Sequence, residues 1–452
     1  MTMTLLRPLR HPQYRRVWAG QAVSSVGDGV FTVALAGAVL NSRHASDLGY
    51  VLGADGAALV LVSLLGGVLA DRLRRSRAMA LSDAVRALGV LGFALGAVNG
   101  PLIGALALAA LIGSGTALFQ PAFGALTPFL VPAEDLGGAN ALRTTTGRVA
   151  LVVGPGLGGL LMTLGGTHTA LLFDAATFAV SIFTLVGIKD TARERTGGAS
   201  VLSEAKDGLA AVWARPWVTA IILQGTVQLL FVMGPAVVLL PILLKARGLF
   251  YAYGLMVGLQ SLGSVCGGLA VAAWKPKQPG TAGVCALALL GLELACLALG
   301  LPIPVLGAAM VATGFGYSVF GVLWGTSLQR SIPDELLGRV MSVEMLGTFA
   351  LAPVGLALAP GAVSLLGLKP VLYTAIAVLV ATTVVPLFVT GVRMFGADQA
   401  PTPADEPSAG EPSAGEPSAG EPSADEPSAG EPSADEPSAD EPSAVATAGG
   451  VS

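Results

Sequence analysis

The sequence predicts an all-α membrane protein in which twelve transmembrane helices form two six-helix bundles. Three observations predict this fold. The 452 residues are 53% apolar, only 12% charged and rich in glycine, a composition that soluble domains rarely show. The apolar residues fall into stretches of about 20, the length that crosses a bilayer. The charged residues lie mostly in the turns between these stretches.

The apolar stretches give the twelve candidate spans. They cover residues 17–40, 48–70, 79–98, 102–122, 142–164, 168–188, 217–243, 251–274, 281–300, 303–326, 339–366 and 370–392. We expect no cleavable signal peptide, because the basic N-terminus leads directly into a full-length span.

The distribution of basic residues predicts the orientation. Residues 398–452 hold 13 of the 29 acidic residues and no Lys or Arg, so the net charge of −4 hides a basic remainder. Nineteen Lys and Arg residues lie at the N-terminus, in even-numbered turns or the first two residues of the spans that follow them, or just after the last span, and four lie in odd-numbered turns. The positive-inside rule therefore predicts a plasma (inner) membrane protein with both termini in the cytoplasm.

An internal repeat relates the two halves. At an offset of 201 residues, 63–67 aligns with 264–268, and 131–137 aligns with 332–338. One shared offset at two separate places indicates duplication of a six-helix unit.

The repeat, the charges and the composition divide the chain into four parts. They are an N-terminal bundle (1–188), a cytoplasmic linker (189–216), a C-terminal bundle (217–392) and an acidic tail (393–452). Within the linker, 201–213 is either a short amphipathic helix on the membrane surface or solvated chain. Residues 406–445 repeat Glu-Pro-Ser-Ala-x eight times, a pattern that predicts disorder because proline recurs and little can be buried.

The turn between the second and third spans, residues 67–75, is dense in arginine. It resembles the Gly-x-x-x-Asp-Arg-x-x-Arg-Arg loop of major facilitator superfamily transporters. The residues that match are Gly67, Asp71, Arg72 and Arg75, while Arg74 replaces the usual glycine. In the second half Ala272 aligns with Asp71, so the acidic residue of this loop is not repeated.

Charges around this loop have two interpretations. The arginines either fix the topology only, or form a latch near the cytoplasmic face with Asp83 and Arg86, which can pair at i, i+3 on the third helix. The resemblance implies that such a network stabilises the outward-facing state.

The fifth span carries a Gly-Pro segment that can bend and pack closely. Its residues are Gly154, Pro155, Gly158 and Gly159. The segment is similar to the Gly-Pro motif of drug-exporting antiporters in this superfamily, although the match is partial, since that motif has further glycines upstream where this chain has Thr146-Gly147-Arg148-Val149-Ala150. Ordinary packing of small residues is the alternative interpretation.

A wider resemblance covers most of residues 12–392. Segments 17–28, 121–123 followed by 130–136, and 329–340 resemble the superfamily branch that includes enterobactin-exporter-like and macrolide-efflux-like bacterial proteins. The resemblance implies transport, but members of this branch differ widely in substrate.

Ionisable residues inside spans are costly and are therefore functional candidates. The candidates for proton coupling or for lining the substrate cavity are Asp28, Arg148, Asp55 and Asp174. Asp28, in the first span, is the first choice for a carboxylate that exchanges a proton for substrate, with Arg148 as its counter-ion or as the site of an anionic substrate. The alternative for Asp28 is helix packing, bonded to Ser24 or Ser25.

Other chemistry is not indicated. The three cysteines and three histidines lack metal-ligand spacing, and no phosphate loop or nucleophile elbow occurs. We therefore expect no cofactor, no metal, no enzymatic activity and no nucleic-acid partner, and a monomer in the lipid bilayer.

These observations predict a secondary active transporter that exports a small hydrophobic or amphiphilic compound, a drug or secondary metabolite, in exchange for protons by alternating access. Two alternatives stay open. One is a siderophore or metabolite exporter, or an uptake carrier, of the same fold. The other is a membrane sensor or scaffold that does not transport.

Overall fold

The computed structural model describes residues 6–70, 74–188, 190, 201–274 and 276–396, and its helices all belong to one compact unit, Met1–Glu406. These residues form helices and turns, with no strand among them. Long helices follow from the sequence because a backbone in lipid must satisfy its hydrogen bonds within its own segment.

The first half contains five long helices. They are α2 (Pro12–Ser42), α3 (Ala45–Ala70), α4 (Arg75–Ala94), α5 (Leu102–Leu126) and α6 (Leu136–Leu185). Helix α6 is two passes in one, because Gly166 has φ 75° and ψ 177° and breaks the helical path between them. Glycine stands at this reversal because a positive φ is costly for other residues. The backbone stays helical through Pro155, and the bend expected at the Gly-Pro segment stays a prediction.

The second half repeats this plan with more interruptions. Its passes are α8 (Pro216–Gln228) continued by a π-helical segment (Leu229–Met233) and α9 (Gly234–Ala246), α10 (Tyr253–Ala273), α11 (Pro279–Leu287) with α12 (Leu290–Leu299), α13 (Ile303–Ser331), α14 (Asp334–Phe349) with α15 (Ala352–Leu366), and α16 (Leu368–Val384). Between the halves, the linker contains α7 (Val201–Trp213), so the helix is the correct one of the two alternatives for 201–213.

These helices account for the predicted number of spans. In the described residues, ten helical segments are long and apolar enough to cross a membrane. One of them, Ala133–Leu185, crosses twice because it reverses at Gly166. Helix α4 is the remaining pass: its 20 residues span about 30 Å, although it carries several charges. The protein is therefore an all-α membrane protein with twelve passes.

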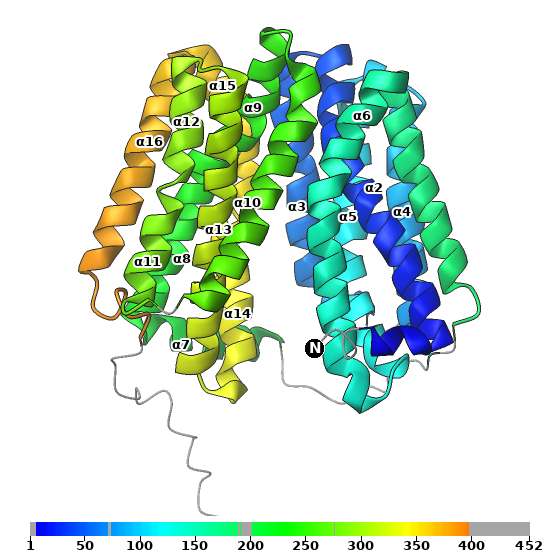
Figure 1. The fold of residues 1–452 in the computed structure, drawn as a ribbon, viewed down its shortest axis with the longest axis horizontal. Helices are drawn as coiled ribbons and strands as arrows, with labels where there is room; N and C mark the ends of the chain where they lie inside the picture. The colour runs from blue at the N-terminus through cyan, green and yellow to red at the C-terminus, as the bar shows by residue number, and fades with distance from the viewer. Residues whose placement is uncertain (1–5, 71–73, 189, 191–200, 275, 397–452) are drawn as a thin grey trace, which may run out of the picture. The chain divides into compact units, whose positions relative to one another are not determined.

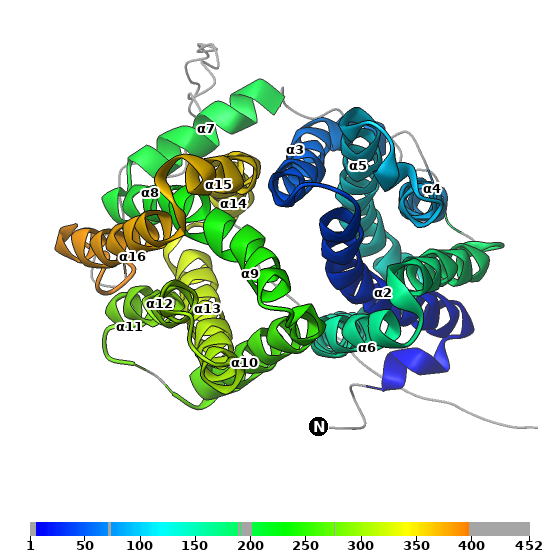
Figure 2. The ribbon, with the colours of Figure 1, turned by 90° about the horizontal axis from the view of Figure 1, so that it is seen from above.

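The halves form two bundles that meet along two seams (Figures 1 and 2). Helix α3 packs against α15 at one seam, and α6 packs against α10 at the other. Both seams depend on glycine. A Cβ on Gly53 would lie 2.9 Å from the Pro353 oxygen, and one on Gly254 would lie 2.3 Å from the Pro155 oxygen. Small residues thus allow the two backbones to approach closely.

The bundles are in contact at one end of the seams and leave space at the other. We call the end where α2 and α6 begin the terminal side. On the opposite side, Lys245 Nζ of α9 donates a hydrogen bond to the Leu40 oxygen of α2. Toward the terminal side, cavities of about 670 Å³ and 520 Å³ lie in the α3 and α6 seams respectively. The bundles therefore separate on the terminal side, as Figure 1 shows.

Candidate functional site

The centre of the first bundle contains a buried cluster of charges, which we call the Arg86 cluster. Its members are Asp28 on α2, Asp83 and Arg86 on α4, and Asp174 on α6. Arg86 Nη1 lies 3.0 Å from Asp28 Oδ1, and Arg86 Nη2 pairs with Asp83 Oδ1. One guanidinium therefore bridges carboxylates from two helices, the geometry for which arginine is suited.

Hydrogen bonds hold the Asp83 carboxylate from its other side. The Ser181 hydroxyl donates to Asp83 Oδ2 at 2.5 Å, and Gln21 Nε2 donates to Ser181 Oγ at 2.7 Å. Asp83, Ser181 and Gln21 are all buried. The network thus connects α4, α6 and α2, and it fixes Asp83 as the rigid side of the cluster.

Two aromatic rings enclose the guanidinium. The Arg86 Cζ atom lies 4.7 Å from the Phe119 ring centroid and 4.4 Å from that of Phe178. Gly115 of α5 makes room for the side chain, because a Cβ there would lie 2.6 Å from Arg86 Cγ. The rings contribute cation–π attraction and keep the surroundings dry, which strengthens the ion pairs.

Asp174 is the least satisfied member of the cluster. It is fully buried, its Oδ2 has no hydrogen-bond partner among the described residues, and its Oδ1 lies 3.4 Å from Thr177 Oγ1. Asp174 interacts electrostatically with Asp28 and Arg86. Gly27 permits this proximity, since a Cβ there would lie 2.4 Å from Asp174 Oδ1.

Asp28 is the accessible member of the cluster. Its side chain is 49% exposed, whereas that of its partner Arg86 is 3% exposed. Its neighbours Gly27 and Gly29 are both buried, and Gly29 lies against Gly154 of α6. A small molecule or water can therefore reach the Asp28 carboxylate while the rest of the cluster stays enclosed.

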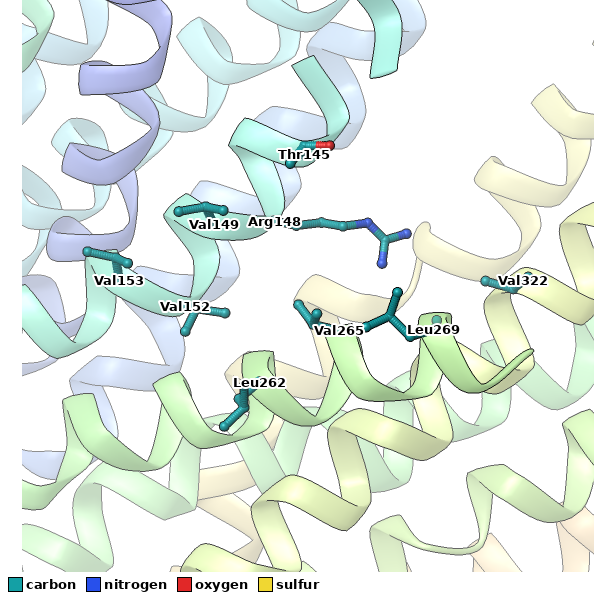
Figure 3. Close-up of a pocket in the computed structure, with 10 residues that line it drawn as sticks. Thr145, Arg148, Val149, Val152, Val153, Leu262, Val265, Leu269 and Val322 are labelled. Carbon is teal, nitrogen blue, oxygen red and sulfur yellow. The ribbon is translucent and has the colours of Figure 1, made fainter. Parts of the chain in front are cut away.

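The expected pairing of Asp28 with Arg148 is wrong. In the structure Asp28 pairs with Arg86, while Arg148 extends from α6 into the seam cavity next to α10 (Figure 3). The expected contact between Asp83 and Arg86 is present, and it is part of the buried cluster. The i, i+3 spacing identified this contact within α4. It could not identify which residue of α2 faces Arg86, because that depends on helix packing.

The remaining candidates lie elsewhere. Asp55 is half-buried on α3 and forms no side-chain hydrogen bond or ion pair with the described residues. Asp71 and Arg72 lie outside the described residues, and Gly67 lies within α3. Arg75 begins α4, and its Cζ lies 4.0 Å from the Phe129 ring centroid.

The Gly-Pro segment of α6 acts as a packing surface. Gly154 lies against Gly29 and Gly158 against Val30, both on α2. Gly159 and Pro155 face Gly254 of α10 across the seam. One short segment thus packs against its own bundle and against the other bundle.

Two interactions on the terminal side were not anticipated. Asp190 accepts hydrogen bonds from the Ser76 backbone N–H at 3.0 Å and from its hydroxyl at 2.7 Å, at the start of α4. Asp135, just before α6, pairs with Arg7 at 3.0 Å and with His11 at 2.8 Å. Asp190 lies at the N-terminal end of α4, where the helix dipole favours an anion. The sequence could not identify this contact, because it depends on where α4 begins.

Groups of side chains suited to a metal are not found in the described part of the chain. The Arg86 cluster can hold a proton or an organic cation beside Asp28, or release Arg86 to an anion.

Comparison with known proteins supports the architecture. The family model described as "Major Facilitator Superfamily" matches residues 17–350. The chain is 29% identical to the multidrug efflux pump Tap of Mycolicibacterium fortuitum over 384 residues, which is 79% of this chain and 90% of that protein. It is 28% identical to the enterobactin exporter EntS of Escherichia coli O1:K1 / APEC over 352 residues, covering 75% and 82% of the two chains.

Solved structures agree with the fold. A mutant of the nucleoside transporter NupG gives a TM-score of 0.68 at 12% identity, covering 83% of this chain and 99% of that one. A bacterial homologue of the iron transporter ferroportin, in an inward-facing state, gives a TM-score of 0.66 at 18% identity. The match covers 83% of this chain and 98% of that one. At these identities the similarity concerns the fold alone.

Proposed function

Since the chain belongs to the major facilitator superfamily, we propose that it exports a small hydrophobic or amphiphilic compound in exchange for protons. It does so as a monomer in the plasma membrane, with both termini in the cytoplasm, by rocking its two bundles about the seams. The observation that carries the proposal is the Arg86 cluster with its single accessible carboxylate. Membership in a transporter family also favours transport over an enzymatic role.

The charges of the cluster supply the coupling. Three carboxylates face one guanidinium, so two negative charges remain uncompensated if every carboxylate is ionised. Uncompensated charges are costly at membrane depth. A proton on the cluster reduces this cost, and a bound cationic or polar group beside Asp28 has the same effect. A proton, or a polar group of the substrate, can therefore occupy the position beside Asp28.

The direction is proposed from two further observations. The open terminal side is cytoplasmic if the positive-inside rule holds, so the cavities face the compartment from which an exporter loads its substrate. The relatives named above are an efflux pump and an exporter. Because one is named for enterobactin, a siderophore is the second candidate for the exported molecule.

The proposal is tested by efflux in a bacterial strain that lacks its own pumps, against antibiotics, dyes and siderophores. We expect the wild type to lower accumulation of at least one compound. Asp28→Asn abolishes proton-driven export of that compound, because an amide cannot carry the proton, and Asp28→Glu retains part of it.

Asp47→Asn is the matched control. It removes a carboxylate that pairs with Arg43 at 2.9 Å outside the Arg86 cluster, and we expect near wild-type export. Full export by Asp28→Asn, with unchanged pH dependence, would contradict the coupling role. Failure of the wild type to export any compound would contradict the export function.

A further inference from the structure

The seam between α6 and α10 contains a cavity of about 520 Å³, a volume typical of small-molecule sites. Its wall is mostly apolar, with Val152 from α6, Val265 and Leu269 from α10, and Val322 from α13. Figure 3 shows these side chains around the extended side chain of Arg148. The cavity is built from both bundles, so its shape changes whenever the bundles move against each other.

Arg148 is the charged side chain in this lining, and Thr145 is its polar neighbour. Within the described part of the chain, Arg148 has no hydrogen bond and no ion pair. It lies 12 residues after the start of α6 and 18 before the reversal at Gly166, or about 18 Å and 27 Å along the helix. A cation at this depth needs a partner.

The opposite wall leaves room at the end of the Arg148 side chain. A Cβ on Gly268 would lie 3.0 Å from Arg148 Nη1 and 3.2 Å from Ser318 Oγ. Gly268 therefore leaves the guanidinium open, and the Ser318 hydroxyl lies close to the same position. An acidic group placed beside Gly268 can accept hydrogen bonds from the Arg148 guanidinium and from the Ser318 hydroxyl.

We propose that this cavity binds the transported compound when it is an anionic amphiphile, with its acidic group on Arg148 and its apolar body along Val152 and Val265. The inference rests on the proposed function and narrows its substrate class. A ligand with an acidic group is favoured by charge complementarity, because Arg148 is an unpaired cation in an apolar wall. Assembly from both bundles favours a transported molecule over a resident lipid, since the site is remade in each cycle.

Binding to the full-length protein in phosphatidylcholine nanodiscs tests the proposal without requiring transport. The probes are the dye anilinonaphthalenesulfonate and its uncharged analogue phenylnaphthylamine. We expect Arg148→Gln to weaken sulfonate binding about ten- to hundredfold and to leave the neutral dye unchanged. Arg148→Lys retains part of the preference. Arg143→Gln is the matched control on the same helix, because Arg143 faces Phe123 and is not part of the lining.

Three results would overturn the proposal. One is equal sulfonate affinity in wild type and Arg148→Gln at unchanged thermal stability. The second is the same loss in Arg143→Gln. The third is complete displacement of the dye when phosphatidylglycerol replaces part of the phosphatidylcholine, which would identify a lipid site. Loss of proton-driven export in cells with intact sulfonate binding would instead contradict the proposed function, so the two failures are distinguishable.

Discussion

The two halves share a scaffold but not its chemistry. At the offset of 201 residues, the four members of the Arg86 cluster, Asp28, Asp83, Arg86 and Asp174, correspond to Leu229, Val284, Leu287 and Ala375. Three of these counterparts, Val284, Leu287 and Ala375, are buried apolar residues, and Leu229 begins the π-helical segment. At these corresponding positions, charge therefore occurs in the first half only.

Other features are retained in both halves. Ser181, which binds Asp83, corresponds to Thr382, which accepts a hydrogen bond from Gln228 at 2.9 Å. Gly115 corresponds to Gly316, and both lie against the preceding helix pass of their bundle. The common features are those that pack helices, and the features that differ are those that carry charge. The first half is thus the proposed coupling unit, and the second half is the partner against which it moves.

The largest expected effect on stability and export comes from replacing Arg86 of the first half with leucine, the residue at the corresponding position of the second half. Arg86→Leu copies Leu287 and leaves the Asp28 and Asp83 carboxylates without their cation. Removing one member of a buried ion pair costs about 3–5 kcal/mol of stability. We expect a lower melting temperature in detergent and no proton-driven export, measured by thermal unfolding and by the efflux assay.

The control converts the whole cluster. Asp28→Leu, Asp83→Val, Arg86→Leu and Asp174→Ala together remove every charge, and buried charge networks can often be replaced by apolar residues without loss of stability. We expect this protein to regain most of its thermal stability and to remain uncoupled. Coupled export by the converted protein would show that the cluster is structural.

The sequence predicted the features that depend on periodicity and composition. Twelve spans follow from apolar runs, and the helix at 201–213, one of two alternatives for that segment, follows from an amphipathic pattern. The partner of Asp28 did not follow, because it depends on how α2 packs on α6 and how α4 packs on α5, where Gly27 lies against Asp174 and Gly115 against Arg86. The reversal at Gly166 lies in the gap predicted between the spans 142–164 and 168–188, but the sequence did not single out this glycine, since many glycines in this chain stay helical.

Glycines at matching positions give a smaller effect that separates packing from coupling. A Cβ on Gly115 would lie 2.6 Å from Arg86 Cγ, whereas one on Gly316 would lie 2.1 Å from the Ala286 oxygen. We expect Gly115→Ala and Gly316→Ala each to cost about 1–3 kcal/mol of stability, because both crowd a packed interface. Gly115→Ala alone displaces Arg86, so only that variant should shift the pH dependence of export. An equal shift in Gly316→Ala would contradict this division.

The smallest expected effect concerns the loop whose acidic residue the second half lacks. Asp71 and Arg72 lie between α3 and α4, where the halves differ because Ala272 occupies the position that corresponds to Asp71. We predict that Asp71→Asn and Arg72→Ala slow export while expression stays close to wild type. A charge pair near a surface contributes about 1 kcal/mol or less, which still shifts the balance between two states of similar energy. Initial efflux rates, normalised to protein in the membrane, measure the change. Wild-type rates in both variants would show that this loop sets topology only, and coupling would then depend on the Arg86 cluster without a latch.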